Sequence, residues 1–443
     1  MSYKLELRYR MNSTHIVVVG SSYSSAAVFN YLEKYLTKAR QPVDLLLLSD
    51  KNHYFFRDLL SEYLCDGCGL DDIVQENRDI GFLKPGVSFL QSKILSIDLN
   101  LKIIKTTNSV IPYHYLVLAP DCELDDSSEY FTYADNSNCF IFNMPADIFM
   151  IKNHIIKNIE KAASEQNDEI KKMLMTFTVV GGCEKAIEIV CSISDYVRNL
   201  IKKKYHEINA SFVKVNLIEE KNNILENKDP FFNTRIVHSL NKRGVNMLLN
   251  SKISGLKKEK IEINHEKEIC SGTIIFTPSY KAPSLIKNLL LKHDESEYAC
   301  VDLYMKADGF DNVFVIGESS KCLDLSENYP RNIAVYKQQS KVCANNIFAK
   351  INNNPLKPLG KTLDINFFPL GYKNLLFGIK DFCLDGFIPW IFYRLLYISY
   401  FLGWKKNLKA FISFLLSNLA LNDQYVLDLE AMSKQKQAVK NLK

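Results

Sequence analysis

Two segments of the chain repeat one pattern: an apolar run rich in β-branched residues, a glycine turn and a stretch with helical apolar spacing. The first is HIVVVGSSYSSAAVF, residues 15–29, and the second is TFTVVGGCEKAIEIV, residues 176–190. A further apolar strand follows each, at 43–48 and at 213–220. This order is typical of a βαβ unit in which the diphosphate of a dinucleotide lies at the start of the helix. Two copies in one chain therefore predict two nucleotide sites.

Other short apolar runs that end in small or turn residues lie at 115–120, 273–279 and 311–322. Such alternation of strands and helices predicts an α/β fold with two Rossmann-like domains on parallel sheets, followed by an amphipathic C-terminal segment. The expected divisions are a first domain in two parts (12–125 and 286–380), a connecting segment (126–170), a second domain (171–285) and a C-terminal segment (381–443).

The composition is that of a globular protein. A chain of 443 residues with 47% hydrophobic content is long enough to bury two or three cores. The formal net charge is only +5, and the lysines are dispersed apart from short runs such as Lys202 to Lys204. Nucleic acid is therefore not expected as a partner.

The cysteines are numerous but scattered. The chain has 11, and its first residues, MSYKLELRYR, lack the apolar core of a secretory signal, so free thiols in a reducing compartment are expected. Met11 is an alternative start. Cys65 and Cys68 form CDGC, which has the spacing of a redox pair or half a zinc site. Since no second CxxC or matching histidine pair accompanies it, ordinary thiols are favoured and no metal site is expected.

After about residue 380 the sequence becomes rich in aromatic and aliphatic residues. Arg394 and the pair Lys405 and Lys406 interrupt the apolar runs before they reach the roughly 20 residues that span a bilayer. Trp390 and Trp404, with lysines near them, favour two short helices lying in the headgroup layer at the cytoplasmic face of a membrane. The alternative is a buried contact with another domain or with a second copy in a homodimer.

The order of these parts resembles the type II NADH dehydrogenases, single-chain flavoproteins that pass electrons from NADH to membrane quinone. The resemblance covers roughly residues 14 to 420. SDKNHYFFRDLL at 49–60 is similar to the family's D-x-x-N-H-x-x-F-x-P-L-L, and IAVYKQQS at 333–340 is similar to A-Q-x-A-x-Q-Q-G. Gly386, Trp390 and Arg394 match its G-x-x-x-W-x-x-x-R. The resemblance implies FAD and NADH as cofactors, with quinone and a membrane surface as partners.

In this resemblance the first glycine turn binds FAD. The glycines of G-x-G-x-x-G would stand at 20, 22 and 25, where this chain has Gly20, Ser22 and Ser25. A ribose-binding acid is expected at the end of the next strand. The family's A-T-G corresponds to a stretch in which Pro120 and Asp121 follow an alanine. A third motif, A-x-G-D-x-A, is similar to VIGESSK. The further residues expected to bind FAD are Ser49 or Asp50, Ala119, Gly317 and Glu318.

The second glycine turn would bind NADH. GGCEKAIEI at 181–189 resembles G-G-G-x-T-G-V-E-L and supplies Gly181, Gly182 and Cys183. Glu219 ends the following strand, where its carboxylate can accept hydrogen bonds from both ribose hydroxyls and repel the extra phosphate of NADPH. NADH is therefore favoured over NADPH.

The mechanism that the resemblance implies is hydride transfer from NADH to flavin N5, followed by electron transfer to a quinone. Glu188 would then lie near the nicotinamide, and Gln338 with Gln339 would line the path of the quinone. The structural alternatives are a solvated helix carboxylate for Glu188 and a helix-surface role for the two glutamines.

Two other functions remain open. One is a catalytically weak or inactive member of the fold that acts as a membrane-associated binding or regulatory protein, because the departures from the family pattern gather at the ligand-facing ends of strands. The other is a sulfide:quinone oxidoreductase, which needs a redox pair of cysteines such as Cys183 and Cys343. Flavin content separates the first from an oxidoreductase, and activity with sulfide would identify the second.

Overall fold

The computed structural model describes most of the chain. It covers residues 13–36, 41–80, 86–125, 127, 138–225, 230–257, 259–325, 330–360, 365–379 and 382–417. The two candidate starts, Met1 and Met11, lie outside the described residues, as does the C-terminal part of the 381–443 segment from residue 418 onward.

The first parallel sheet contains strands from distant parts of the sequence. Its strand order is β21-β9-β1-β2-β5, and every neighbouring pair is parallel. The strands are β1 (Thr14–Val19), β2 (Val43–Ser49), β5 (Val87–Gln91), β9 (Tyr115–Leu118) and β21 (Val313–Val315). Their residues are largely buried, as expected for a parallel sheet with both faces covered.

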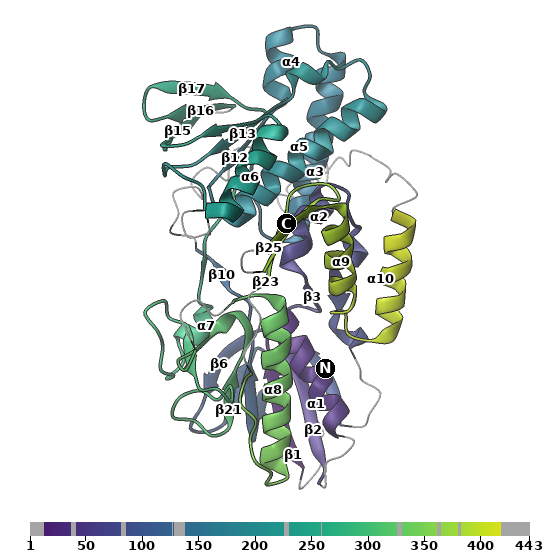
Figure 1. The fold of residues 1–443 in the computed structure, drawn as a ribbon. Helices are drawn as coiled ribbons and strands as arrows, with labels where there is room; N and C mark the ends of the chain where they lie inside the picture. Colours follow the sequence, from purple (N-terminus) through teal and green to yellow (C-terminus); the bar gives the residue numbers. More distant parts are fainter. Residues whose placement is uncertain are drawn as a thin grey trace, which may run out of the picture.

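Helices α1 (Tyr23–Leu36) and α8 (Ile333–Ile351) lie side by side on this sheet (Figure 1). Ser340 on α8 donates a hydrogen bond from Oγ to the Ser24 carbonyl on α1 at 3.2 Å, so small side chains bring the helices close. Between β5 and β9 the chain forms an antiparallel ribbon of β6 (Ile94–Asp98), β7 (Ile103–Thr106) and β8 (Val110–Pro112).

A second parallel sheet has the order β11-β18-β12-β13-β14. The strands are β11 (Cys139–Ile141), β12 (Thr176–Val180), β13 (Lys214–Ile218), β14 (Val245–Leu248) and β18 (Thr273–Phe276). Its helices are α3 (Pro145–Ser164), α4 (Asp168–Leu174), α5 (Glu184–Lys204) and α6 (Pro230–Lys242). After β14 the chain forms an antiparallel ribbon of β15 (Ile253–Lys257), β16 (Lys260–Ile263) and β17 (Lys267–Cys270). The segment 126–170 thus supplies the edge strand β11 and helix α3. Two parallel sheets with helices confirm the predicted α/β fold.

Short elements join the two halves. Strands β10 (Glu123–Leu124) and β19 (Tyr280–Lys281) pair where the chain passes between the sheets. The others are β3 (His53–Phe55), α2 (Leu60–Leu64), β4 (Val74–Glu76), α7 (Ser284–Lys287), β20 (Ala299–Val301) and β22 (Ser320–Cys322), with short 3₁₀ turns that include Arg57–Leu59 and Gly317–Ser319.

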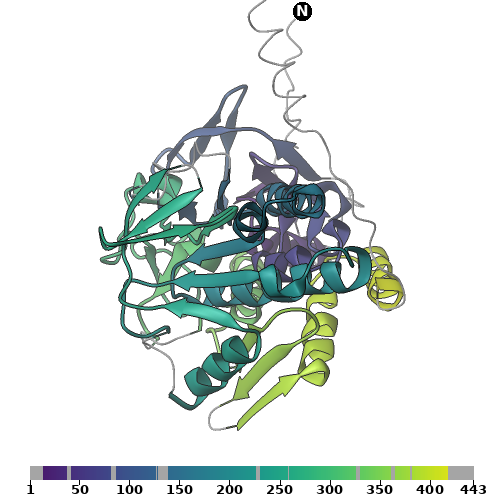
Figure 2. The ribbon, with the colours of Figure 1, turned by 90° about the horizontal axis from the view of Figure 1, so that it is seen from above.

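The C-terminal part forms a three-stranded antiparallel sheet and two helices. These are β23 (Ile365–Pro369), β24 (Leu375–Ile379), β25 (Phe382–Gly386), α9 (Phe387–Ile398) and α10 (Trp404–Ser417). Figures 1 and 2 show α9 and α10 at one side of the molecule. One face of α9 packs inward, whereas Phe387, Ile388 and Phe392 are at least half exposed.

The two tryptophans of this region differ in environment. Trp404 is 71% exposed, as a residue in a headgroup layer requires. Trp390 is fully buried, and its indole nitrogen donates to Oε2 of Glu62 on α2 at 2.8 Å. The expectation that Trp390 also faces the headgroup layer is therefore wrong, because its N–H finds a partner inside the protein.

Within the part of the chain that the structure describes, no helix combines the length and apolar character needed to cross a membrane. Helix α10 nevertheless exposes Leu408, Ile412, Leu415 and Leu416 along its length. We call these four side chains and the three exposed ones of α9 together the α9–α10 face.

The Trp390 contact should contribute to the stability of the whole C-terminal unit. Replacing Trp390 by phenylalanine removes the donor from a buried carboxylate, so we expect the free energy of unfolding to fall by about 1–3 kcal/mol in urea denaturation. Trp404→Phe is the matched control and should change it by less than about 0.5 kcal/mol, since Trp404 is exposed. Equal effects of both substitutions would contradict this role for the Trp390 N–H.

Candidate functional site

The first glycine turn joins β1 to α1 at the carboxyl end of the first sheet. Gly20 has a φ of 141°, and a Cβ on it would lie 2.1 Å from the carbonyl oxygen of Ala119. Only glycine accommodates both conditions. Its N–H donates to the Leu48 carbonyl at 3.0 Å, so the turn begins where β1, β2 and β9 end together.

Two serines replace the other glycines of this turn, and both use their hydroxyls inside the protein. Ser22 Oγ donates to the Ala119 carbonyl at 2.7 Å and accepts from the Ser25 N–H at 3.2 Å. Ser25 Oγ donates to the Ser22 carbonyl at 2.7 Å. Both residues are less than a tenth exposed. The Ser22 hydroxyl thus takes up one N–H at the start of α1 that a diphosphate would otherwise bind.

The end of β2 provides two positions for a ribose contact. Ser49 is buried, and its Oγ accepts a hydrogen bond from the Lys51 N–H at 3.1 Å. Asp50 is exposed. Of the two residues expected here, Asp50 is therefore the one with an exposed side chain, and its contact with a ribose stays a prediction.

Charged side chains from three elements meet where β9 and β21 end. Burial and the Glu318 carboxylate raise the pKa of Asp121 to about 6, and the Arg57 guanidinium opposes this rise. Burial acts against the charge of Arg57, but Glu318, Tyr280 and Asp121 hold its pKa above the usual value. The guanidinium lies 4.4 Å from the centre of the Tyr280 ring. We call Arg57, Asp121 and Glu318 the cleft charge cluster.

The remaining space between α1 and α8 is small. It is a cavity of about 80 Å³, lined by Ser22, Tyr23, the cleft charge cluster, Arg331 and Tyr336 among others. Pockets that hold a drug-sized ligand measure roughly 300–1,000 Å³. This pocket is therefore narrow in this conformation, and Gly20 and Glu318 lie at the strand ends that flank the first turn. A bound FAD would require Ser22 and the cleft charge cluster to move.

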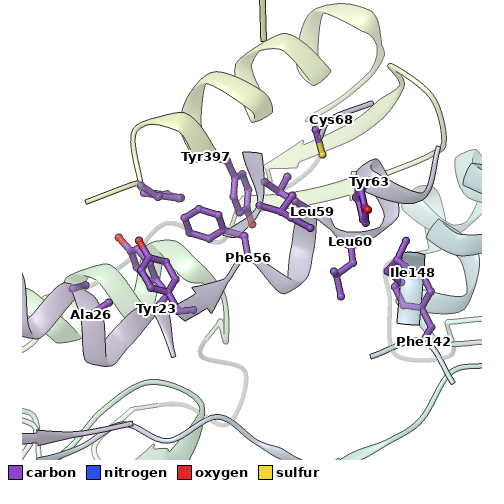
Figure 3. Close-up of a cluster of buried hydrophobic side chains, with 14 of the residues drawn as sticks. Tyr23, Ala26, Phe56, Leu59, Leu60, Tyr63, Cys68, Phe142, Ile148 and Tyr397 are labelled. Atoms are coloured by element: carbon purple, nitrogen blue, oxygen red, sulfur yellow. The ribbon is translucent and has the colours of Figure 1, made fainter. Parts of the chain in front are cut away.

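The aromatic wall of the cleft connects it to the C-terminal helices. Figure 3 shows Tyr23, Phe56 and Tyr397 next to one another. The ring centres of Tyr23 and Phe56 are 5.7 Å apart, and those of Phe56 and Tyr397 are 5.6 Å apart. The Tyr397 hydroxyl also donates to Oδ2 of Asp58. Helix α9 is thereby fixed to the segment that carries Arg57.

The second glycine turn is more accessible. Gly181 has a φ of 119°, and its N–H donates to the Ile218 carbonyl at 2.8 Å, which repeats the backbone arrangement at Gly20. Gly182 lies against Glu219, since a Cβ on it would be 2.4 Å from Glu219 Oε2. Cys183 precedes α5 and is exposed. The start of α5 and a carboxylate at the end of β13 thus stand together, as a dinucleotide requires.

Glu188 lies one helical turn inside α5 and is buried. Its Oε2 accepts hydrogen bonds from Ser61 Oγ at 2.9 Å and from Lys185 Nζ at 2.5 Å. Burial raises the pKa of Glu188 to about 7, and Lys185 opposes that rise. The carboxyl can therefore bind or release a proton near neutral pH, and a fully solvated helix carboxylate does not describe it.

Lys185 is a residue of the site that sequence reasoning missed. Burial lowers its pKa, but Glu188 and Asp58 more than offset this and leave the pKa above its ordinary value. The only clue in the sequence is the spacing of three residues between Lys185 and Glu188, which places the two side chains on one helix face. Arg57 and Asp121 were missed as well, since nothing in the sequence shows that they meet.

The two glutamines of α8 point in different directions. Gln339 is buried, and its Oε1 accepts from the Gly317 N–H at 2.9 Å, which holds the turn after β21. Gln338 donates to the Gly360 carbonyl at 3.3 Å near the surface. The structure therefore does not bring them together with Glu188, and their contact with a quinone stays a prediction.

The CDGC pair directly follows α2, whose Ser61 contacts Glu188. Cys65 and Cys68 are buried free cysteines. Burial raises both thiol pKa values, that of Cys68 to about 12, so the unreactive protonated forms predominate. Among the described residues, no group of three or more histidine, cysteine, aspartate or glutamate side chains is placed to hold a metal ion.

Comparisons with known proteins agree with this geometry. The family model of the pyridine nucleotide-disulphide oxidoreductases matches residues 14–339. A probable NADH dehydrogenase of Dictyostelium discoideum is 23% identical over 371 residues, 80% of each chain. The type II NADH:quinone oxidoreductase Ndh of Mycobacterium tuberculosis is 21% identical over 427 residues, 91% of this chain and 88% of that one.

A structural comparison gives the same fold. NDH2 from Plasmodium falciparum, solved in complex with NADH, superposes with a TM-score of 0.75. The alignment covers 94% of this chain and 100% of that chain, at 17% sequence identity. At this identity the likeness shows the architecture alone.

The raised pKa of Glu188 predicts a pH-dependent stability. Burial raises its pKa from 4.5, the ordinary value, to about 7 in the folded protein. Its contribution to the free energy of unfolding is therefore complete below pH 4.5 and is lost as the pH rises through 7. The free energy of unfolding of the wild type, measured in urea, should fall by about 1–3 kcal/mol between pH 5 and pH 8. Glu188→Gln should abolish this fall. Glu184→Gln, at an exposed position of α5, is the control. An unchanged pH dependence in Glu188→Gln would refute the buried protonated carboxyl.

Proposed function

Because the chain belongs to the pyridine nucleotide-disulphide oxidoreductase family, we propose that it is an NADH:quinone oxidoreductase of the type II kind. The named relatives support this proposal, since that of Mycobacterium tuberculosis is named a type II NADH:quinone oxidoreductase and that of Dictyostelium discoideum a probable NADH dehydrogenase, and both align with most of this chain. The observation that carries it is the second glycine turn, where Gly182, Glu219 and the start of α5 stand together.

NADH would bind at this second turn. Its diphosphate would lie at the start of α5, and the Glu219 carboxylate would accept hydrogen bonds from the adenosine ribose. Glu219 Oε1 already accepts from the Lys221 N–H at 3.0 Å, which fixes the carboxylate at the end of β13. The same negative charge would repel the additional phosphate of NADPH.

Glu188 and Lys185 would control the proton near the nicotinamide. The Glu188 carboxyl can hold a proton on Oε1 near neutral pH, while Lys185 and Ser61 donate to Oε2 and fix its orientation. Hydride transfer itself needs no acid or base from the protein. The role of these residues would therefore be to orient the nicotinamide and to hold a proton beside it.

FAD is the cofactor of this proposed activity, and when bound it would carry electrons between NADH and quinone. Its place is the first turn, with Gly20, Ser22 and Ser25 at the diphosphate, Ser49 or Asp50 at the ribose, and Ala119, Gly317 and Glu318 along the chain. Since the pocket at this turn is narrow in this conformation, FAD binding would be coupled to movement at Ser22 and Asp121.

Quinone would arrive from a membrane to which the α9–α10 face attaches. Exposed Phe392, Leu408 and Leu416 supply apolar area, and Lys405 next to them can meet anionic headgroups. Attachment at the cytoplasmic face fits the reducing compartment that the cysteines indicate. A homodimer through the same face is the alternative arrangement.

A specific observation favours a second candidate function. The cleft charge cluster and Ser22 line a narrow pocket at the first turn, and this favours a catalytically weak or inactive family member that binds NADH and a membrane. Purified protein separates the two functions. One bound flavin per chain with NADH oxidation by a quinone supports the enzyme, and colourless protein that still binds NADH after incubation with excess FAD supports the second candidate.

Glu219 should set the choice between NADH and NADPH. Replacing it by glutamine removes the repulsive charge, so we expect the ratio of NADH to NADPH affinity to fall about tenfold. Fluorescence titration of the reduced nucleotides measures this ratio without requiring turnover. Glu220→Gln, at the adjacent exposed position, is the matched control and should leave the ratio unchanged. A ratio that stays the same in Glu219→Gln would place the nucleotide elsewhere.

A further inference from the structure

A second polar hollow lies on the far part of the second domain. It is a groove of about 700 Å³ between α5, α6 and the C-terminal sheet. Figure 2 shows α6 beside that sheet. Arg198 lies 15 residues beyond Cys183, so at 1.5 Å per residue the groove is about 22 Å along α5 from the proposed NADH turn. It is therefore distinct from the proposed NADH turn, and none of its lining residues belongs to the first turn.

Positive charge dominates the walls of this groove. Four lining residues are arginines or lysines, namely Arg198, Arg235, Lys242 and Arg243, and only Asp195 and Asp385 are acidic. The volume lies within the range of roughly 300–1,000 Å³ that small-molecule sites occupy. An anion of that size is the ligand that such a groove would attract.

The two carboxylates are already used by two of the cations. Arg243 donates to both oxygens of Asp195, at 3.0 and 3.1 Å, and the Tyr372 N–H donates to Asp195 Oδ2 at 2.9 Å. Arg235 pairs with Asp385 at 3.1 Å. These contacts fix the walls of the groove and leave no carboxylate for the other cations.

Arg198 and Lys242 have no ion-pair partner among the residues that the structure describes. Arg198 is held only through Nε, which donates to Ser194 Oγ at 3.4 Å, and its terminal nitrogen lies over Gly244. Across the groove, the side-chain oxygen of Asn374 is buried without a hydrogen-bond partner. A guanidinium with free N–H groups, an ammonium and an unsatisfied amide therefore line one space.

We propose that this groove binds a phosphate-bearing anion. The planar guanidinium of Arg198 matches two phosphate oxygens, and Lys242 supplies a second positive charge. The Asn374 side-chain oxygen can accept a hydrogen bond only from a hydroxyl group of the same ligand. Asp385 on the rim is followed by α9, whose exposed Phe387 belongs to the α9–α10 face. The phosphate can therefore belong to a lipid headgroup or to a soluble compound.

The experiment uses the full chain and pyrophosphate as the probe, with binding followed by titration calorimetry. We expect saturable binding that weakens about tenfold or more in Arg198→Gln/Lys242→Gln. Lys202→Gln/Lys203→Gln is the matched control, because it removes the same charge from exposed positions of α5 outside the groove. Unchanged NADH binding in the groove variant shows that the second domain remains folded.

Vesicles distinguish the two sources of phosphate. If phosphatidylglycerol in phosphatidylcholine vesicles displaces pyrophosphate from the wild type, the site takes a lipid headgroup, and if it does not, the site takes a soluble anion. The proposal is overturned if pyrophosphate shows no saturable binding, or if both double variants lose affinity equally. Neither result would affect the proposed NADH site, which the Glu219→Gln titration tests separately.

Discussion

The hydrogen bond from Ser22 Oγ to the Ala119 carbonyl decides what the first half of the molecule can bind. It joins the end of β9 to the start of α1, and the same oxygen takes up the Ser25 N–H. A dinucleotide turn works because the start of its helix offers unpaired N–H groups to a diphosphate. In the second turn Gly182 carries no side chain, and the Glu219 carboxylate lies close to where a Cβ would stand. The two halves share an architecture but differ in accessibility.

The cleft also depends on the C-terminal helices. Tyr397 on α9 donates to Asp58 and packs on Phe56, and Trp390 donates to Glu62. Any opening of the first turn that moves the Arg57 segment must therefore disturb contacts with α9. If the α9–α10 face attaches to a membrane as proposed, that attachment and the entry of a cofactor would be coupled through the same packing.

The local pattern of the sequence predicts the frame of the structure well. Ile16 to Val19 and Phe177 to Val180 form buried parallel strands because continuous apolar runs before a glycine turn have few other solutions. The resemblance to type II NADH dehydrogenases is confirmed by the named relatives and by the fold. The positive φ of Gly20 and Gly181 also follows from their place in the pattern.

Contacts between distant segments could not be predicted in this way. Ser61 meets Glu188, and Arg57 lies beside Asp121 and Glu318, because tertiary packing unites residues that the sequence separates by many elements. Trp390 shows the same limit: its sequence context suits a membrane surface, yet a buried carboxylate on α2 binds its indole. The periodicity of the sequence identifies which residues follow the end of a strand, but it does not show whether their side chains lie in the cleft.

The most direct measurement is the affinity for FAD of the wild type and of Ser22→Gly, obtained by flavin fluorescence titration after removal of any bound flavin. If the Ser22 hydroxyl closes the first turn, its removal should strengthen FAD binding about tenfold, since opening no longer breaks its two hydrogen bonds. Weaker FAD binding by Ser22→Gly, from a wild type that already binds one FAD tightly, would contradict a turn closed by serine.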